Sequence, residues 1–170
     1  MQVSWYVLHS KPNKESLLGE QLSLRKIETF LPQIRVHPVN PRARKIKPYF
    51  PGYVFVRLSL DEVGLSVLQW LPGAIGFVSY GGQPSTIPDG LIHAIRKRVD
   101  EINASGGELF NDLKQGDLVE IRSGPFAGYE GIFDTRLTGD ERVRVLLKLL
   151  QGRSTKLDIS AGLLERKKKH

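Results

Sequence analysis

Hydrophobic periodicity divides the first hundred residues into a mixture of strands and helices. Val3–Leu8 and Tyr53–Leu58 are rich in β-branched and aromatic residues, which favours strands. Pro88–Ile102 places its aliphatic residues at helical spacing, which predicts an amphipathic helix with Arg96, Lys97 and Arg98 mostly facing outward. The remaining expected elements are a helix after Ser10-Lys11-Pro12-Asn13, a strand over Thr29–Val36 interrupted by Pro32, a short helix within Asp61–Trp70, and a strand over Ile75–Tyr80 that ends at Gly81-Gly82.

The C-terminal third has a different pattern, with short apolar runs between glycine-bearing turns. Strands are predicted at Asp117–Arg122, Tyr129–Thr135, Arg142–Leu149 and Thr155–Ile159. Short strands so closely spaced indicate a small barrel, which leaves no exposed sheet edge. The run from Arg142 to Leu150 begins with strict alternation and ends rich in leucine, so its periodicity does not decide between strand and helix.

An acidic, Gly- and Ser-containing stretch separates these two regions. Residues 101–113 hold three acids and no Lys or Arg, which is typical of a linker. We therefore predict an N-terminal domain over residues 1–102, a flexible linker over 103–113, a barrel over 114–166 and a basic tail over 167–170. The loop from Pro38 to Pro48 has three prolines, four basic residues and no acid, and is expected to be exposed.

Composition excludes several classes of chemistry. The 170 residues include no cysteine, which removes disulfides, thiolate catalysis and cysteine-ligated zinc. The four histidines are scattered, and no nucleophile–base set or nucleotide-binding fingerprint occurs, so we expect no enzyme, no cofactor and no metal. The N-terminus lacks a secretory signal and no apolar run could span a membrane, so a cytoplasmic protein is expected. The net charge of +7 indicates contact with nucleic acid or an acidic partner.

The aromatic strand behind Phe50-Pro51-Gly52 is the first candidate site. Alternation places Tyr53, Phe55 and Arg57 on one face and the intervening aliphatic residues on the other. Such rings either fill the core or form an exposed apolar patch that binds a protein partner.

Together with other motifs, this strand resembles the NusG family of transcription elongation factors. The resemblance covers nearly the whole chain and rests on these runs in order: Trp5-Tyr6-Val7, Phe50-Pro51-Gly52-Tyr53-Val54-Phe55-Val56, Leu71-Pro72-Gly73-Ala74-Ile75-Gly76-Phe77-Val78, and the KOW-like run Gly116–Gly131. It implies an α+β protein: an antiparallel sheet with flanking helices, joined to a small SH3-like KOW β-barrel.

The resemblance also implies partners and the residues that bind them. The N-terminal domain would dock on the clamp helices of the largest RNA polymerase subunit through Tyr6, Phe50, Tyr53 and Phe55, and the loop before Trp70 would reach the opposite side of the DNA channel. The resemblance thus implies a monomeric elongation or antitermination factor. The KOW domain would recruit the termination factor Rho or a small-subunit ribosomal protein through Phe126 and Tyr129, although that ring at position 126 could equally cover the barrel mouth.

The basic residues form two candidate contacts with the DNA of the elongation complex. Lys11 and Lys14 open the first predicted helix, whereas Arg42, Arg44, Lys45 and Lys47 lie in the proline-rich loop. They are either solvated surface charges or contacts to phosphate, which add affinity without sequence specificity. Leu71-Pro72 offers no arginine that could read a base edge.

Two alternatives remain open at this point. The segments around Ile132 and Leu149 resemble a specialised, RfaH-like branch of the family, in which the C-terminal domain packs as helices on the aromatic patch until it is recruited. That branch has an acidic residue just before its Phe-Pro motif to pair with an arginine at the place of Arg142, whereas this chain has Lys47 there. A ribosome-associated KOW protein that binds RNA is the second alternative, and burial of Phe50, Tyr53 and Phe55 would favour it.

Overall fold

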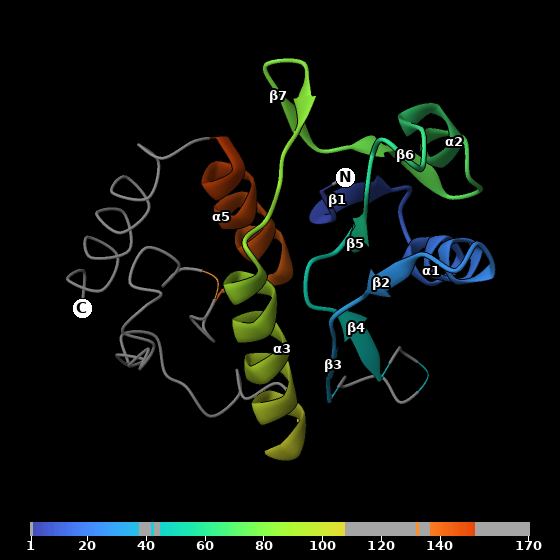
Figure 1. Ribbon diagram of the computed structural model, residues 1–170. Coiled ribbons are helices and arrows are strands. Elements are labelled where there is room, and N and C mark those ends of the chain that lie inside the picture. The colour runs from blue at the N-terminus through green and yellow to red at the C-terminus, as the bar shows by residue number, and fades with distance from the viewer. Residues whose placement is uncertain (1, 38–41, 43–44, 108–131, 133–136, 152–170) are drawn as a thin grey trace. The chain divides into compact units, whose positions relative to one another are not determined.

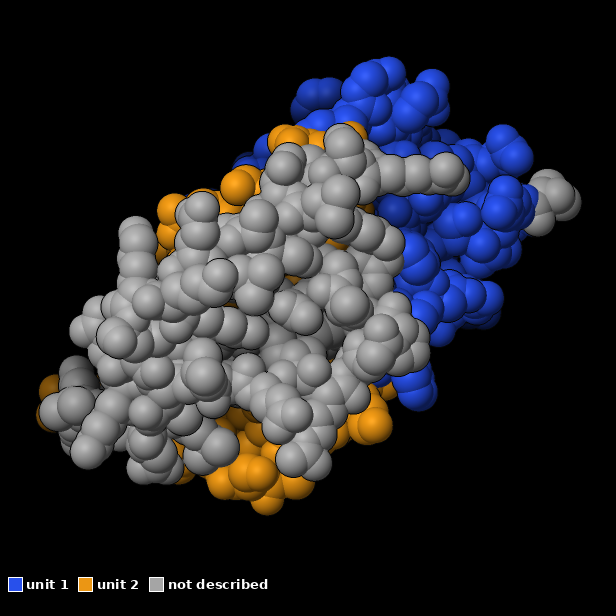
Figure 2. Space-filling model, turned by 90° about the vertical axis from the view of Figure 1, so that its left-hand side faces the viewer, with its two compact units in different colours: residues 1–32, 50–93 blue, residues 33–49, 94–170 orange. Residues whose placement is uncertain are grey.

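The computed structural model describes residues 2–37, 42, 45–107, 132 and 137–151 (Figure 1). The chain divides into two compact units, which Figure 2 colours separately. Unit 1 comprises residues 1–32 and 50–93, and unit 2 comprises residues 33–49 and 94–170. Residues 33–49 of unit 2 thus lie in sequence between the two segments of unit 1, the second of which begins at Phe50.

Unit 1 is built on a four-stranded antiparallel sheet. Its strand order is β2-β5-β1-β6, with bounds Glu28–Phe30, Tyr53–Leu58, Ser4–Ser10 and Ala74–Phe77 respectively. The register places Tyr6 opposite Val56 and Val7 opposite Phe55. β5 is therefore an inner strand with β1 on one side and β2 on the other, and its predicted bounds are confirmed.

Two helices cover one face of this sheet. They are α1, Glu15–Leu24, and α2, Leu65–Gln69. Leu18 and Leu22 of α1 and Leu68 of α2 are fully buried against the even-numbered residues of β1 and β5. The spacing of four between the α1 leucines puts them on one side of the helix. Val54, Val56 and Leu58 of β5 share this core-facing side, as the predicted alternation grouped them.

A hairpin and a long helix follow β6. Strands β7, Ser79–Tyr80, and β8, Gln83–Pro84, are joined by Gly81 and Gly82, which have φ of 62° and 79°. Two successive positive φ values are those of the tight turn that glycine makes accessible in hairpins. The chain then pairs with β1, because the Ile87 N–H donates to the Trp5 carbonyl at 2.9 Å, and enters α3, Asp89–Ala104.

Unit 2 joins a small hairpin to the end of α3. Strands β3, Gln33–Arg35, and β4, Ile46–Pro48, pair antiparallel, so the C-terminal end of the predicted exposed loop is a strand instead. Asn103 secures the hairpin, since its amide donates to the Gln33 carbonyl at 3.0 Å and its oxygen accepts from the Arg35 N–H at 2.9 Å. A predicted strand across Pro32 is thus divided into β2 and β3.

The end of α3 corrects the predicted start of the linker. Asn103 and Ala104 belong to the helix, and Gly107 closes it by donating to the Ile102 carbonyl at 2.9 Å. Gly107 has a φ of +113°, and a Cβ at this position would lie 2.6 Å from the Arg35 carbonyl oxygen. Only glycine fits such a position, so residues 103–107 are packed structure and not linker.

Helix α5, Gly139–Gln151, corrects the strand predicted at Arg142–Leu149. Its N-terminus is a capping box: the Glu141 N–H donates to the Thr138 hydroxyl at 3.2 Å, and the Thr138 N–H donates to the Glu141 carboxylate at 3.3 Å. This reciprocal cap and the leucine-rich run that follows favour helix over the short alternation. The other strands of the predicted barrel lie outside the described residues, except Ile132, so the barrel stays a prediction.

Candidate functional site

The outer face of β5 carries a cluster of aromatic rings in unit 1. Phe55 contacts Phe50 with ring centroids 5.6 Å apart and Phe30 at 5.7 Å. Tyr53 stacks on His9 of β1 at 4.7 Å with nearly parallel planes. We call Phe50, Tyr53 and Phe55 the aromatic patch. The predicted pattern therefore does bring these three residues onto one region of the sheet.

The predicted exposure of this patch is wrong for two of its members. Phe50 and Phe55 are fully buried, and only Tyr53 keeps a half-buried position. Phe55 lies on an inner strand, where it contacts the ring of Phe30 on β2 and the ring of Phe50 before the bend. Tyr53 stands at the end of the strand, next to the bend, and is the ring that this structure leaves accessible.

Tyr6 does not join the aromatic patch. Its register opposite Val56 puts it on the other face of the sheet, in the core beneath α1 and α2. There it is 7% exposed and meets Phe77 edge-on, with centroids 6.0 Å apart. The expectation that Tyr6 shares a surface with Phe50 and Phe55 is therefore wrong, because side chains of adjacent strands in register alternate together.

A buried carboxylate fixes the bend before Tyr53. Glu15 is 5% exposed and accepts a hydrogen bond from the Gly52 N–H at 3.1 Å. The Gly52 carbonyl in turn accepts from the Ser10 N–H at 2.7 Å. Gly52 has a φ of +86°, which glycine adopts without steric cost. The bend thus couples the start of β5 to the end of β1.

Burial favours the neutral form of both stacked rings. It lowers the pKa of His9 below its ordinary value. Burial, and then the nearby Tyr80 phenol, raise the pKa of Tyr53. At neutral pH the pair is therefore an uncharged aromatic surface, which suits contact with an apolar partner better than a charged imidazolium would.

The two predicted basic clusters fall in different units. Lys11 and Lys14 are exposed in one turn of unit 1, in which the Lys14 N–H donates to the Lys11 carbonyl at 3.1 Å. Arg42 and Lys45 are exposed in unit 2, between β3 and β4, together with Lys47 on β4 itself. Arg44 lies outside the described residues, as do Phe126 and Tyr129. Each described cluster presents cations to solvent, as a phosphate contact requires.

A contact that the sequence patterns did not predict links Tyr49 to α5 within unit 2. The buried Arg142 guanidinium lies 4.1 Å from the centre of the Tyr49 ring, and its Nε donates to the Tyr49 carbonyl at 2.9 Å. Its Nη1 donates to the Leu137 carbonyl at 2.6 Å. The Tyr49 hydroxyl donates to the Ile132 carbonyl at 2.6 Å. The Thr138-x-x-Glu141 capping signal could have predicted the helix, but not its partner.

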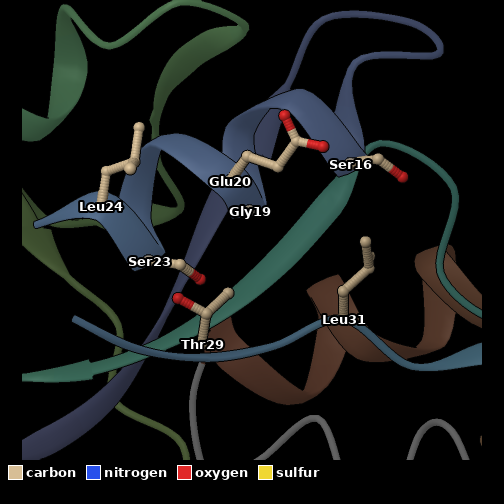
Figure 3. A pocket seen from close by; sticks show the side chains of 7 residues that line it. All are labelled: Ser16, Gly19, Glu20, Ser23, Leu24, Thr29 and Leu31. Atoms are coloured by element: carbon tan, nitrogen blue, oxygen red, sulfur yellow. The ribbon is translucent and has the colours of Figure 1, made fainter. Parts of the chain in front are cut away.

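A surface groove of about 720 Å³ opens between α1 and β2 in unit 1 (Figure 3). It is lined by Ser16, Gly19, Glu20, Ser23, Leu24, Thr29 and Leu31. Glu20 is the only acid or base among these residues, so the groove offers no paired groups for proton transfer. Nothing in its lining suggests catalysis.

Metal and membrane chemistry also find no support in the described part of the chain. None of its His, Asp and Glu side chains form a group of three that could hold a metal ion. Among the same residues, no helix has the length and apolar character needed to cross a membrane. The candidate binding residues that the described structure leaves accessible are Tyr53, which is half-buried, and the exposed members of the two basic clusters.

Comparison with known proteins gives a consistent result. A family model described as "Transcription termination factor nusG" matches residues 3–96. The transcription termination/antitermination protein NusG of Deinococcus radiodurans is 24% identical over 184 residues, covering 94% of this chain and 96% of that protein. NusG of Escherichia coli K12 is 24% identical, with 95% of both chains covered, and NusG of Borreliella burgdorferi is 24% identical, with 98% and 100% covered.

A solved structure described as "Domain interaction in Thermotoga maritima NusG" is also similar, at a TM-score of 0.44 and 23% identity. The match covers 72% of this chain and 68% of that one.

Proposed function

Because this chain belongs to the NusG family, as the match over residues 3–96 establishes, we propose that it is a transcription factor that binds RNA polymerase during elongation. Members of this family are not enzymes, and neither is this chain. The relatives that match this chain over almost their whole length are named transcription termination/antitermination proteins. The protein acts in the cytoplasm by binding, as an elongation and antitermination factor.

The proposed polymerase contact is centred on Tyr53. Tyr53 is the accessible member of the aromatic patch, and its neutral stack with His9 presents an apolar surface. Phe50 and Phe55 are buried and contact each other, so they contribute to the rigidity of the strand that carries Tyr53 and not to its surface. An aromatic anchor on a rigid strand is the kind of residue that dominates protein interfaces. The proposed partner is the pair of clamp helices in the largest polymerase subunit.

The basic clusters supply the second part of the proposal. Lys11 and Lys14 in unit 1, and Arg42, Arg44 and Lys45 in unit 2, contact the phosphates of DNA in the elongation complex. The observation that supports this role is the exposure of the four described residues among them. The C-terminal region recruits a further partner, Rho or a small-subunit ribosomal protein, through Phe126 and Tyr129.

Binding of the full chain to bacterial core RNA polymerase tests the proposal. The variant Tyr53→Ala should weaken binding by at least tenfold, as truncation of an interface anchor does. Phe55→Ala is unsuitable, because it would empty a fully buried site and destabilise the domain. The matched control is Leu24→Ala, which removes an apolar side chain that is 76% exposed on α1. Equal polymerase binding by both variants and the wild type would refute the proposed contact.

One observation favours a second, more specialised candidate function. Helix α5 is capped by its own sequence and engages Tyr49, the residue directly before Phe50. We infer that the C-terminal region acts as a regulatory segment that holds Tyr49, and through the chain the residues that follow it, until the factor is recruited. Arg142 contacts the Tyr49 ring and carbonyl, so this restraint does not need an acidic residue at the place of Lys47.

A further inference from the structure

The groove between α1 and β2 lies within unit 1, on the face of the sheet that α1 covers. Tyr53 belongs to the other face, since it alternates with Val54, which points into the core beneath α1. In the order β2-β5-β1-β6 of the described strands, β2 is an edge strand. The groove therefore runs beside a sheet edge and is separate from the proposed polymerase contact.

Two leucines give the groove apolar walls. Leu24 of α1 is 76% exposed, because Leu18 and Leu22 already occupy the buried side of the helix. Leu31, which follows β2, is half-buried and packs against the core. Figure 3 shows Leu31 projecting toward α1 from below the helix. The groove thus presents apolar surface from both of its sides.

Gly19 keeps the middle of the groove free of side-chain atoms. It lies inside α1 and contributes to the lining. A Cβ at this position would meet nothing within 4 Å, so no close contact among the described residues requires a glycine here. Glycine nevertheless weakens a helix interior relative to alanine. The space that it leaves is what close approach of another chain requires.

Glu20 is the one charged residue in the lining and sets the charge that a ligand should carry. It is exposed and lies one turn before Leu24. No hydrogen bond or ion pair joins its carboxylate to another described residue. The nearby Arg25 is engaged elsewhere on α1, since it donates to the carbonyl and to the side-chain oxygen of Gln21 at 3.1 and 3.3 Å. A lone carboxylate beside leucines complements a lysine, whose aliphatic stem packs on apolar side chains while its ammonium meets the carboxylate.

We propose that this groove binds an extended segment of a protein partner, in which a lysine or arginine lies two residues from an aliphatic residue. That spacing puts both side chains on one side of an extended chain. The cation pairs with Glu20, the aliphatic side chain packs against Leu24 and Leu31, and the backbone passes over Gly19. An extended segment suits the site because β2 is an edge strand, and peptides commonly bind alongside such edges.

A peptide array tests the proposal with the full-length protein. It holds acetylated, amidated heptapeptides with a central lysine, leucine or valine two residues from that lysine, and varied residues elsewhere. The strongest binder is then labelled and titrated by fluorescence anisotropy. Glu20→Gln should lower its affinity by up to about fivefold, as loss of an exposed ion pair does, and by less at high salt. Leu24→Ala should lower it by about tenfold, because apolar contact area is lost.

Gly19→Met separates binding from folding. Methionine is a better helix former than glycine, and its side chain would fill the groove. The variant should therefore unfold at the same or a higher urea concentration, while its affinity for the peptide falls by about tenfold or more through the clash. Glu62→Gln, which removes an exposed acid outside the lining, is the charge control and should leave peptide binding unchanged. Glu20→Lys should gain affinity for a peptide whose central lysine is replaced by glutamate.

Each further outcome overturns the proposal. If no peptide of the array binds, or if Glu20→Gln, Leu24→Ala and Gly19→Met all leave binding unchanged, the groove is not the site. If replacing the leucine or valine of the peptide by serine changes nothing, the protein attracts cations without using the groove.

Core polymerase binding of the same variants distinguishes this site from the polymerase contact. Leu24→Ala and Gly19→Met should bind polymerase as the wild type does, whereas Tyr53→Ala should weaken polymerase binding and leave peptide binding unchanged. Either contact can thus fail without the other. If the groove variants weaken polymerase binding as Tyr53→Ala does, the groove is part of the polymerase interface and the proposal of a separate partner fails.

Discussion

The stacked pair of His9 and Tyr53 makes the stability of unit 1 depend on pH. Burial lowers the pKa of His9, so the unfolded chain binds the proton more readily than the folded one. The stabilisation by the neutral ring is fully present above the ordinary histidine pKa of about 6.5 and is lost as pH falls through the lower folded value. His9→Phe keeps a ring for the stack and removes the titration.

This predicts that the denaturation midpoint in urea falls between pH 8 and pH 5 by more in the wild type than in His9→Phe. The difference should be modest, because the imidazole is only partly buried. Both proteins share all other titrating groups, so the comparison isolates His9. An identical fall in both proteins would mean that the stacked imidazole titrates as it does in the unfolded chain.

Two glycines should respond in opposite directions to alanine. Gly107→Ala places a Cβ 2.6 Å from the Arg35 carbonyl oxygen at a φ of +113°. We therefore expect the free energy of unfolding to fall by about 1–3 kcal/mol. Gly19 lies inside α1 with nothing within 4 Å of its added Cβ, so Gly19→Ala should gain about 0.5–1 kcal/mol. Thermal or urea unfolding measures both, and equal effects would show that neither local environment governs the change.

At the scale of the element, α5 depends on its cap. Thr138→Ala removes the hydroxyl that accepts the Glu141 N–H and should weaken the helix by about 1 kcal/mol. Amide exchange over residues 139–151 should accelerate accordingly. Glu141→Gln preserves a side chain that can complete the capping box and should change exchange little. Slow exchange that survives Thr138→Ala would mean that packing alone holds this helix.

The elements that the sequence predicted well are those in which local pattern and tertiary environment agree. β5 has its predicted bounds because alternation and β-branched residues suit an inner strand, and the apolar face of α3 is buried as its spacing indicates. α5 was not predicted, because the alternation of Arg142–Val145 favours a strand, whereas the cap formed by Thr138 and Glu141 begins a helix. The burial of Phe50 and Phe55 could not be predicted, since alternation assigns a face but not what covers it.

For the candidate site, the sequence predicted which residues to consider but not how buried each of them is. Phe50 and Phe55 do lie in contact, but both are buried, and Tyr6 belongs to the opposite face. Lys11 and Lys14 are exposed, and their role as DNA contacts stays a prediction. The contact between Tyr49 and Arg142 had no sequence signal, because it joins segments far apart in the chain. Such long-range pairs follow from the fold and not from local periodicity.

At the scale of the whole molecule, the contact of Arg142 with Tyr49 predicts an activated variant. Arg142→Met keeps an unbranched, buried side chain, although a shorter one, and removes the hydrogen bonds to the carbonyls of Tyr49 and Leu137. Leaving a buried carbonyl without its hydrogen-bond donor should lower the free energy of unfolding by about 1–3 kcal/mol. If α5 restrains Tyr49 and the residues that follow it, this loss shifts the population toward the binding-competent state and raises polymerase affinity about tenfold.

The matched control is Arg144→Met, two residues along the same helix, where the side chain is exposed. Binding to core polymerase and amide exchange over α5 are measured on the same three proteins. Faster exchange and tighter binding in Arg142→Met alone are the expected result. Faster exchange with unchanged polymerase binding would show that the stability of α5 does not affect the partner. That result would refute the regulatory proposal, because α5 would then be a structural element and not a restraint.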